Sequence, residues 1–377
     1  MDAWQTLRLQ FPVADRMIYL NHAAVSPLPL RAKDLMQSYL EELTHRGAAG
    51  YPAAVLDVLD RARLLSARLI GTTPGHVFFV RSTTQGLSVV ATGLPRLGAG
   101  DNVVLVEREF PANLRPWLPL RRRGVDVRLV PQRGGRVLID DLAAAVDART
   151  AVVSVSFVQF LSGFRVDVAG VAELCRRHDA LFVLDAIQGL GAFPVDVEAM
   201  GVDFLSADAH KWLLGPEGVG IGYASARALE RIEPAVEGWF AVKDPFDFFD
   251  IEQPLKETAA RYEEGAYNVG GVHGLVGSLE VLLSAGIDQL APRILGLTDH
   301  LVEGLRSRGW DVLSPRETEG EKSGIVLAGR EGVDFDRLRA TLAEQRIQIS
   351  VRGGKLRIAP HGYNTFEELD RVLQVLG

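Results

Sequence analysis

The chain has 377 residues, 47% of them hydrophobic and 24% charged, which indicates a folded soluble protein long enough for two domains. Its formal net charge of −7 disfavours a nucleic-acid-binding protein, and its single cysteine excludes a disulfide framework or a cysteine-rich zinc site. No apolar run is long enough to span a membrane and residues 1–10 lack the apolar core of a signal peptide, so we expect a cytoplasmic protein without a metal site.

Short apolar runs alternate with helical patterns through the middle of the chain. A helix with one buried face is predicted from Leu87, and another from Val168. This alternation predicts an α/β fold with a mostly parallel sheet, whose ligands bind beyond the carboxyl ends of the strands. The predicted strands lie at residues 76–80, 102–106, 125–130, 151–157, 181–184, 204–206 and 218–223.

The pattern changes from about residue 275, where long helices replace the alternation. Helices are predicted at 275–284 and 291–308, short strands near 324–328 and 355–358, and a final helix from Thr365. We therefore predict a large domain at 17–270 and a smaller α+β domain formed by 1–16 and 271–377.

Three polar motifs each follow a predicted strand. The first is Ser82-Thr83-Thr84-Gln85-Gly86, which precedes a helix. The free N–H groups and the dipole of a first helical turn favour an anion such as phosphate, although Ser or Thr at this position is more often a plain helix cap.

The second motif is Asp185 with Gln188. A carboxylate at a strand end can keep a pyridine nitrogen protonated, and Gln188 could donate to the phenolic oxygen of the same ring. The third is His210-Lys211 before a glycine-rich strand, where a desolvated lysine would be nucleophilic enough to form a Schiff base. Alone, Asp185 reads as a cap and Lys211 as a surface lysine, but the three motifs together, in this order, favour a pyridoxal phosphate site.

With these motifs the chain resembles the class V aminotransferase family of fold-type I pyridoxal-5′-phosphate (PLP) enzymes. That family includes cysteine desulfurases, selenocysteine lyases, kynureninase and isopenicillin N epimerase. The resemblance implies a seven-stranded sheet in the large domain, an amino-acid substrate and a homodimer with shared active sites. It is carried by residues 19–24, 79–86, 111–117, the Asp185 and Lys211 motifs, 268–271 and 357–365.

The resemblance also implies roles for individual residues. Lys211 would hold the cofactor as a Schiff base and move the Cα proton, with Asp185 on the pyridine nitrogen. Arg357 would bind the substrate carboxylate, a task suited to a guanidinium. The remaining cofactor contacts would be Thr83 and Thr84 at the phosphate, His210 and Asp208 beside it, Gln188 and Gln159 near the ring, and Asn268 toward the phosphate of the partner subunit.

Some positions depart from the relatives. Phe110 stands where desulfurases carry a histidine that stacks on the ring, so we assign Phe110 to the ring face, with ordinary core packing as the alternative. Asn21 and His22 would contact substrate, although a purely structural role for His22 is an equal alternative. Asp208 replaces a serine of many relatives, and a carboxylate beside a phosphate is unfavourable unless it is bonded elsewhere.

The desulfurase nucleophile has no counterpart. Residues 350–357 contain no cysteine, and Cys175 lies at an apolar helix position. We therefore expect a PLP enzyme acting through a Cα carbanion, with aminotransferase-type chemistry favoured and a C–S lyase or an amino-acid epimerase as alternatives. A non-catalytic PLP-binding protein is disfavoured because it would not need Arg357, and a P-loop nucleotide-binding protein because GxxxxGK[ST] is absent.

Overall fold

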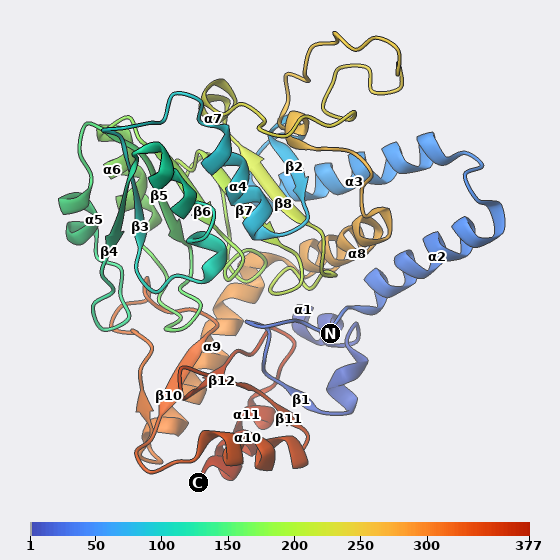
Figure 1. Cartoon of the computed structure of the whole chain (residues 1–377). Helices are drawn as coiled ribbons and strands as arrows, with labels where there is room; N and C mark the ends of the chain where they lie inside the picture. The colour runs from blue at the N-terminus through green and yellow to red at the C-terminus, as the bar shows by residue number, and fades with distance from the viewer. Residues whose placement is uncertain (1) are drawn as a thin grey trace.

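A seven-stranded sheet forms the centre of the computed structural model, which describes residues 2–377 (Figure 1). Its strands are β2 (Val77–Val80), β3 (Asn102–Val106), β4 (Asp126–Val130), β5 (Thr150–Ser156), β6 (Leu181–Asp185), β7 (Phe204–Asp208) and β8 (Gly220–Ala224). Their order is β2-β8-β7-β6-β5-β3-β4, and β8 is antiparallel to both neighbours while the other adjacent pairs are parallel. The predicted mostly parallel sheet is confirmed. Residue 1, part of the predicted segment 1–16, lies outside the described residues.

Helices cover both faces of this sheet, because successive strand residues point to opposite sides. Val104 and Val106 of β3 join one core, whereas Val103 and Leu105 join the other. The first core is closed by α3 (Tyr51–Ile70), α5 (Ile139–Ala145), α6 (Val168–Arg177) and α8 (Val269–Ala285), and the second by α4 (Thr83–Gly93) and α7 (Ala226–Arg231).

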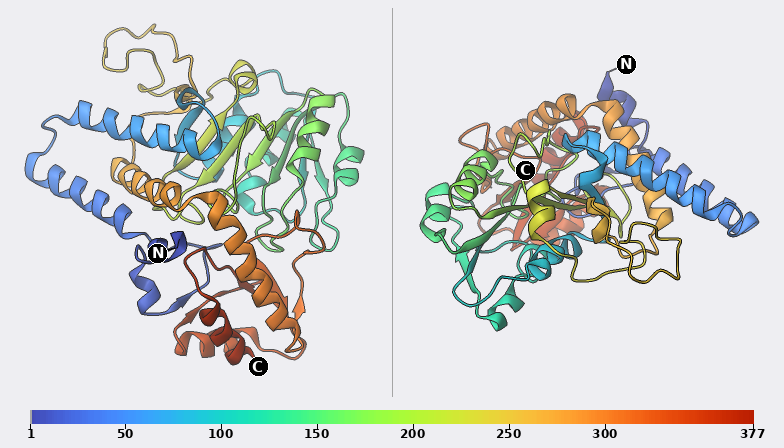
Figure 2. Two further views of the ribbon diagram at one scale, coloured as in Figure 1. Left: turned by 180° about the vertical axis from the view of Figure 1, so that it is seen from behind. Right: turned by 90° about the horizontal axis from the view of Figure 1, so that it is seen from above.

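Two long helices without a sequence-based prediction extend away from the sheet, as both views in Figure 2 show. They are α2 (Leu30–Arg46) and α3, joined at their outer ends. α2 buries Ala32, and Leu35 and Tyr39, three and seven residues further on, pack against the large core, so the helix has a narrow apolar face. β8 begins two residues after its predicted start, because Gly218 adopts a positive φ of 77° in the preceding turn.

A smaller antiparallel sheet lies below the first, in the order β12-β13-β10-β9. Its strands are β9 (Asp311–Val312), β10 (Val326–Gly329), β12 (Ser350–Arg352) and β13 (Lys355–Ile358). The helices α9 (Ile287–Arg306), α10 (Phe335–Glu344) and α11 (Phe366–Leu376) pack on it in a separate core.

The N-terminal segment packs on this smaller part of the chain. β1 (Ile18–Tyr19) pairs in parallel with β11 (Ile347–Gln348). From α1 (Ala3–Arg8), Arg8 donates to Glu368 at 2.7 Å.

α8 and α9 connect the two sheets. α8 buries Leu275 and Leu279 in the core of the large sheet, whereas α9 buries Leu297 and Leu301 in the core of the small one. The domain boundary at 270/271 stays a prediction.

Within residues 2–377 no single helix has the length and apolar composition to cross a membrane. α8 and α9 reach that length and composition only together, as a pair bent by 80°.

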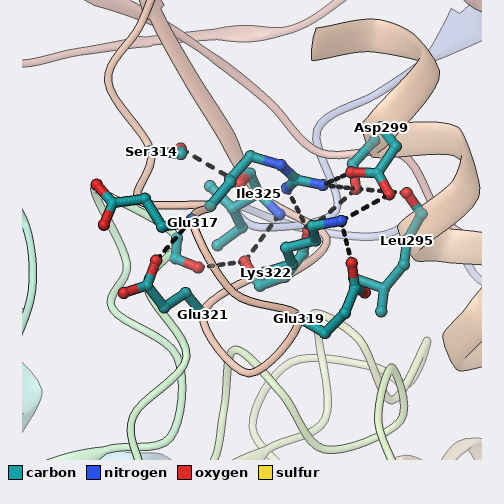
Figure 3. Close-up of polar contacts among 12 residues, drawn as sticks. Leu295, Asp299, Ser314, Glu317, Glu319, Glu321, Lys322 and Ile325 are labelled. Carbon is teal, nitrogen blue, oxygen red and sulfur yellow. Dashed lines mark hydrogen bonds and ion pairs between the residues drawn. The ribbon is translucent and has the colours of Figure 1, made fainter. Parts of the chain in front are cut away.

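A cluster of ion pairs fixes the segment between β9 and β10 (Figure 3). Lys322 pairs with Asp299 of α9 at 3.1 Å and also with Glu319. On its other side Glu321 accepts from Arg136 of the large part at 2.8 Å. The segment therefore ties the small sheet to the large part of the chain.

Candidate active site

A cavity of about 390 Å³ opens at the carboxyl ends of the large sheet. Residues from both sheets line it, because β12 and β13 of the small sheet face the loops that follow the parallel strands. The lining comprises Ala23, Ala24, Val25, Ser82, Thr83, Thr84, Phe110, Ala112, Phe160, Ile187, Gln188, Asp208, His210, Lys211, Arg352 and Arg357.

Lys211 lies in this cavity, three residues after the end of β7. Only 6% of its surface is exposed. Burial lowers the pKa of its amine to about 8; the charge of Asp185 opposes this shift, and that of Arg357 adds to it. With this pKa roughly a tenth of the amine is neutral at pH 7, far more than for an ordinary lysine, so Lys211 is the better nucleophile.

Asp185 is the last residue of β6 and is buried. Its Oδ1 accepts a hydrogen bond from the backbone N–H of Ile187 at 3.1 Å. Burial raises the pKa of this carboxyl to about 7, and the nearby Glu109 adds to the shift while Lys211 opposes it. A carboxyl of this kind gains strongly from a cationic partner such as a protonated pyridine.

Gln188 lines the cavity, but its amide is largely committed to protein partners. Nε2 donates to the carbonyl oxygen of Ala23 at 3.0 Å, and Oε1 accepts from Trp212 Nε1 at 2.9 Å. One N–H of Nε2 remains for another acceptor. The contact with a phenolic oxygen stays a prediction.

The first turn of α4 offers free hydrogen-bond donors at the cavity wall. Ser82 caps the helix by accepting from Gln85 N at 3.2 Å. Thr83 Oγ1 accepts from the backbone N–H of Asp208 at 3.1 Å, so its hydroxyl proton is available to a ligand. Thr84 is exposed to the same space.

Asp208 has partners of its own, which removes the objection to a carboxylate beside a phosphate. Its Oδ1 accepts from Ala209 N at 2.8 Å, and Oδ2 lies 3.2 Å from His210 Nδ1. The pair can therefore present an imidazole, and not a bare carboxylate, to an anion.

Phe110 occupies the side of the cavity next to Lys211. Its ring centre lies 5.2 Å from Lys211 Nζ, and the ring meets Phe160 edge-on at 5.4 Å. Because 43% of Phe110 is exposed, ordinary core packing does not explain its position.

Arg357 brings a positive charge into the cavity from β13. It is 3% exposed, and its Nη1 and Nε donate to Phe160 O at 2.8 Å and Ser350 Oγ at 3.3 Å. Burial lowers the pKa of its guanidinium to about 10, and the charge of Arg352 adds to this. Among residues 2–377 no carboxylate forms an ion pair with Arg357, so an anionic ligand group would be a favourable partner.

Five predicted site residues do not line the cavity: Asp185, described above, and Asn21, His22, Gln159 and Asn268. His22 is completely buried: Nδ1 faces Ala359 O and Nε2 faces Tyr363 Oη, each at 2.8 Å. Burial lowers its pKa well below the usual value. These contacts favour the structural alternative for His22, which leaves neither ring nitrogen free for a substrate in this structure. Its neighbour Asn21 bridges to Ala359, and the cavity is lined instead by Ala23 and the two residues that follow.

Gln159 and Asn268 also have other partners. Gln159 is 1% exposed, donates to Glu109 at 3.0 Å and accepts from Gln132 at 2.7 Å, so it does not line the cavity. Asn268 is exposed and caps α8 by accepting from Gly271 N at 3.0 Å. A contact of Asn268 with the phosphate of a partner subunit stays a prediction.

The sequence profile of the family described as aminotransferase class-V matches residues 18–371. The chain belongs to the class V aminotransferase family. A protein of Methanothermobacter thermautotrophicus named "Probable cysteine desulfurase" is 30% identical, covering 99% of this chain and 96% of its own length. Another of the same name from Halalkalibacterium halodurans is 27% identical, covering 85% of this chain and 81% of its own length.

Solved structures share the whole fold. The apo cysteine desulfurase of Thermococcus onnurineus NA1 superposes with a TM-score of 0.90 at 24% identity, covering 98% of this chain and 96% of that one. The cystine C–S lyase C-DES, in complex with cysteine persulfide, has a TM-score of 0.89 at 22% identity, covering 97% and 99%. Both confirm the fold-type I architecture.

This class V enzyme depends on pyridoxal phosphate, and the residues present fit that cofactor. A buried lysine of lowered pKa and the open first turn of α4 line one cavity, and the buried carboxyl of Asp185 lies near enough to that lysine for each charge to shift the pKa of the other group. They match the cofactor's aldehyde, its pyridine nitrogen and its phosphate. Glu109, a buried carboxyl beside Asp185, went unnoticed in the sequence because nothing in the pattern distinguishes it from an exposed glutamate.

Proposed function

We propose that this enzyme is a PLP-dependent C–S lyase, which eliminates the sulfur substituent from Cβ of a cysteine-type amino acid. The favoured sequence-based interpretation was transamination, with C–S cleavage as the alternative. The names of the relatives support the alternative, since the 30% identical protein is called a probable cysteine desulfurase. The observation that carries the proposal is that Lys211 and the unpaired Arg357 line one cavity, away from the single cysteine.

The side chains of this cavity would divide the work. When bound, pyridoxal phosphate withdraws electrons from Cα of the attached amino acid and makes the Cα proton acidic. Lys211 would take that proton, because its lowered pKa makes it a base near neutral pH. Arg357 would hold the substrate carboxylate, and Asp185 would keep the cofactor's ring nitrogen protonated.

The sulfur would leave as a free thiol, because no protein thiol is within reach. Cys175 lies on α6, is 2% exposed and does not line the cavity. The overall reaction is R–S–CH₂–CH(NH₃⁺)–COO⁻ + H₂O → R–SH + pyruvate + NH₄⁺. The proton on the leaving thiol comes from the substrate and solvent, and no oxidant or reductant is needed.

The test is product analysis of the holoenzyme with cysteine, cystine and S-alkyl cysteines, with and without an α-keto acid. A lyase forms pyruvate and a thiol or persulfide in equal amounts without the keto acid, and Lys211→Ala does not. Amino-group transfer that requires the keto acid, without thiol release, would establish transamination instead. Change of configuration alone would establish an epimerase.

We also propose that the enzyme is a homodimer with shared active sites. The segment that precedes Asn268 exposes large apolar side chains: Phe248 is 66%, Phe249 95% and Ile251 87% exposed. Exposed apolar clusters of this kind favour a protein interface. Light scattering should give twice the chain mass, and Phe249→Glu should weaken the dimer; a monodisperse, active monomer would refute this.

A further inference from the structure

Glu109 is a buried carboxyl for which the proposed reaction has no use. It follows β3 by three residues and is 4% exposed. Oε1 accepts from Ser156 N at 2.9 Å and from Gln159 Nε2 at 3.0 Å, and Oε2 accepts from Ser156 Oγ at 2.6 Å. Every hydrogen bond to it comes from a neutral donor.

No cation compensates this group. In the part of the chain that the structure describes, Glu109 forms no ion pair, and burial raises the pKa of its carboxyl. Burying a carboxyl without a cationic partner is costly, and such groups are concentrated at functional sites.

The hydrogen bonds of Glu109 connect it to the strand end that carries Asp185. Ser156, which supplies two of them, is paired with Asp185 where β5 and β6 run side by side. The next residue, Phe157, donates its N–H to Asp185 O at 2.9 Å. The charge of Glu109 is also a main cause of the raised pKa of Asp185, second only to burial.

We propose that Glu109 is a positioning residue for the cofactor's ring nitrogen: anchored on Ser156, it fixes the end of β6 and adds a second negative charge beside Asp185. Two carboxyls close together repel each other when both are ionised, and a cation between or beside them relieves that repulsion. A protonated pyridine supplies that cation. The ring nitrogen then keeps its proton to a higher pH than Asp185 alone would allow.

The other charged groups around the pair are few. Lys211, after β7, faces Asp185 and partly offsets its charge. The charges of Arg357 and Arg352 from the small sheet lower the pKa of Lys211, and that of Asp208 from β7 raises it. Lys211, Arg352 and Arg357 line the cavity, where the substrate would bind. Removing the charge of Glu109 therefore leaves Asp185 as the single carboxylate of the pair.

The experiment follows the ring nitrogen directly. The holoenzyme is prepared with ¹⁵N-labelled pyridoxal phosphate, and the nitrogen chemical shift is recorded against pH. In Glu109→Gln the nitrogen should lose its proton roughly one pH unit or more below the wild-type value. Ser156→Ala keeps the carboxylate but removes one donor, so a smaller shift in the same direction is expected.

Glu107→Gln is the matched control, because Glu107 is exposed on the same segment and should titrate as wild type. If Glu109→Gln titrates like Glu107→Gln while losing only thermal stability, Glu109 is merely structural and the proposal is wrong. If Glu109→Gln does not fold, an unshifted Ser156→Ala overturns it. This experiment measures the protonation of the cofactor and not which substrate bond is broken. The proposal for Glu109 can therefore fail while the C–S lyase proposal stands, and the reverse.

Discussion

The side-chain nitrogen of Lys211 lies 5.2 Å from the centre of the Phe110 ring. Contact with an aromatic face stabilises the protonated amine by a modest amount. Burial acts in the opposite direction and dominates, since the pKa of Lys211 is lowered to about 8. The charge state of this amine therefore changes around pH 8.

Covalent capture of pyridoxal phosphate by the apoenzyme should accelerate as the pH rises through about 8. Only the neutral amine attacks the aldehyde, and the neutral fraction grows tenfold per pH unit below the pKa. Stopped-flow absorbance measures the rate, and borohydride reduction with peptide mapping identifies the lysine. Lys256→Ala is the control, because Lys256 also has a lowered pKa and lies over an aromatic ring, but outside the cavity. An adduct on any lysine other than Lys211 would contradict the assignment.

Asp185→Asn should bind the cofactor and lose most of its turnover. The amide is nearly isosteric but carries no charge, so the ring nitrogen's pKa should fall by roughly 1–3 units. Cofactor content and turnover number are measured on the same preparation. A variant with near-normal turnover would show that the carboxylate is only structural.

Arg357→Ala should weaken amino-acid binding by roughly 2–5 kcal/mol, because it removes a buried charge-assisted contact. Amines that lack a carboxylate should bind equally to both proteins. Titration of the cofactor absorbance with matched amine and amino-acid ligands separates the two cases. Arg352→Ala is a useful companion, since Arg352 is exposed at the same cavity and should have a smaller effect. Equal losses for both ligand classes would mean that Arg357 supports the fold.

Much of the fold and the centre of the site could be predicted because both follow from local patterns. Strands of a parallel sheet end at one edge, so motifs placed after β2, β6 and β7 had to meet. Thr83, Asp185 and Lys211 are the result. The long helix α2 was not predicted, although Ala32, Leu35 and Tyr39 recur at helical spacing and pack it on the large part.

Contacts between distant segments could not be predicted in this way. His22 was assigned to substrate, but Tyr363, 341 positions away, occupies its Nε2. Gln159 was assigned to the cofactor, and its partner Glu109 lies 50 positions earlier. Side-chain direction after a strand end depends on such partners, and single-sequence periodicity carries no information about them.

Cys175→Ser should leave turnover per folded enzyme unchanged. Cys175 packs in the large core on α6, and burial with the nearby Asp203 raises the pKa of its thiol to about 12. A thiol that stays protonated and enclosed cannot attack the sulfur of a bound substrate. The substitution should cost about 1–3 kcal/mol of stability, because a hydroxyl replaces a thiol in an apolar environment. Cys175→Ala removes the sulfur without adding a hydroxyl, so it separates loss of the thiol from the cost of burying a hydroxyl.

The enzyme is incubated with cysteine, alkylated and mapped by mass spectrometry, and no persulfide is expected at position 175. A persulfide there, together with activity lost in both variants, would make the enzyme a thiol-dependent desulfurase and refute elimination to a free thiol.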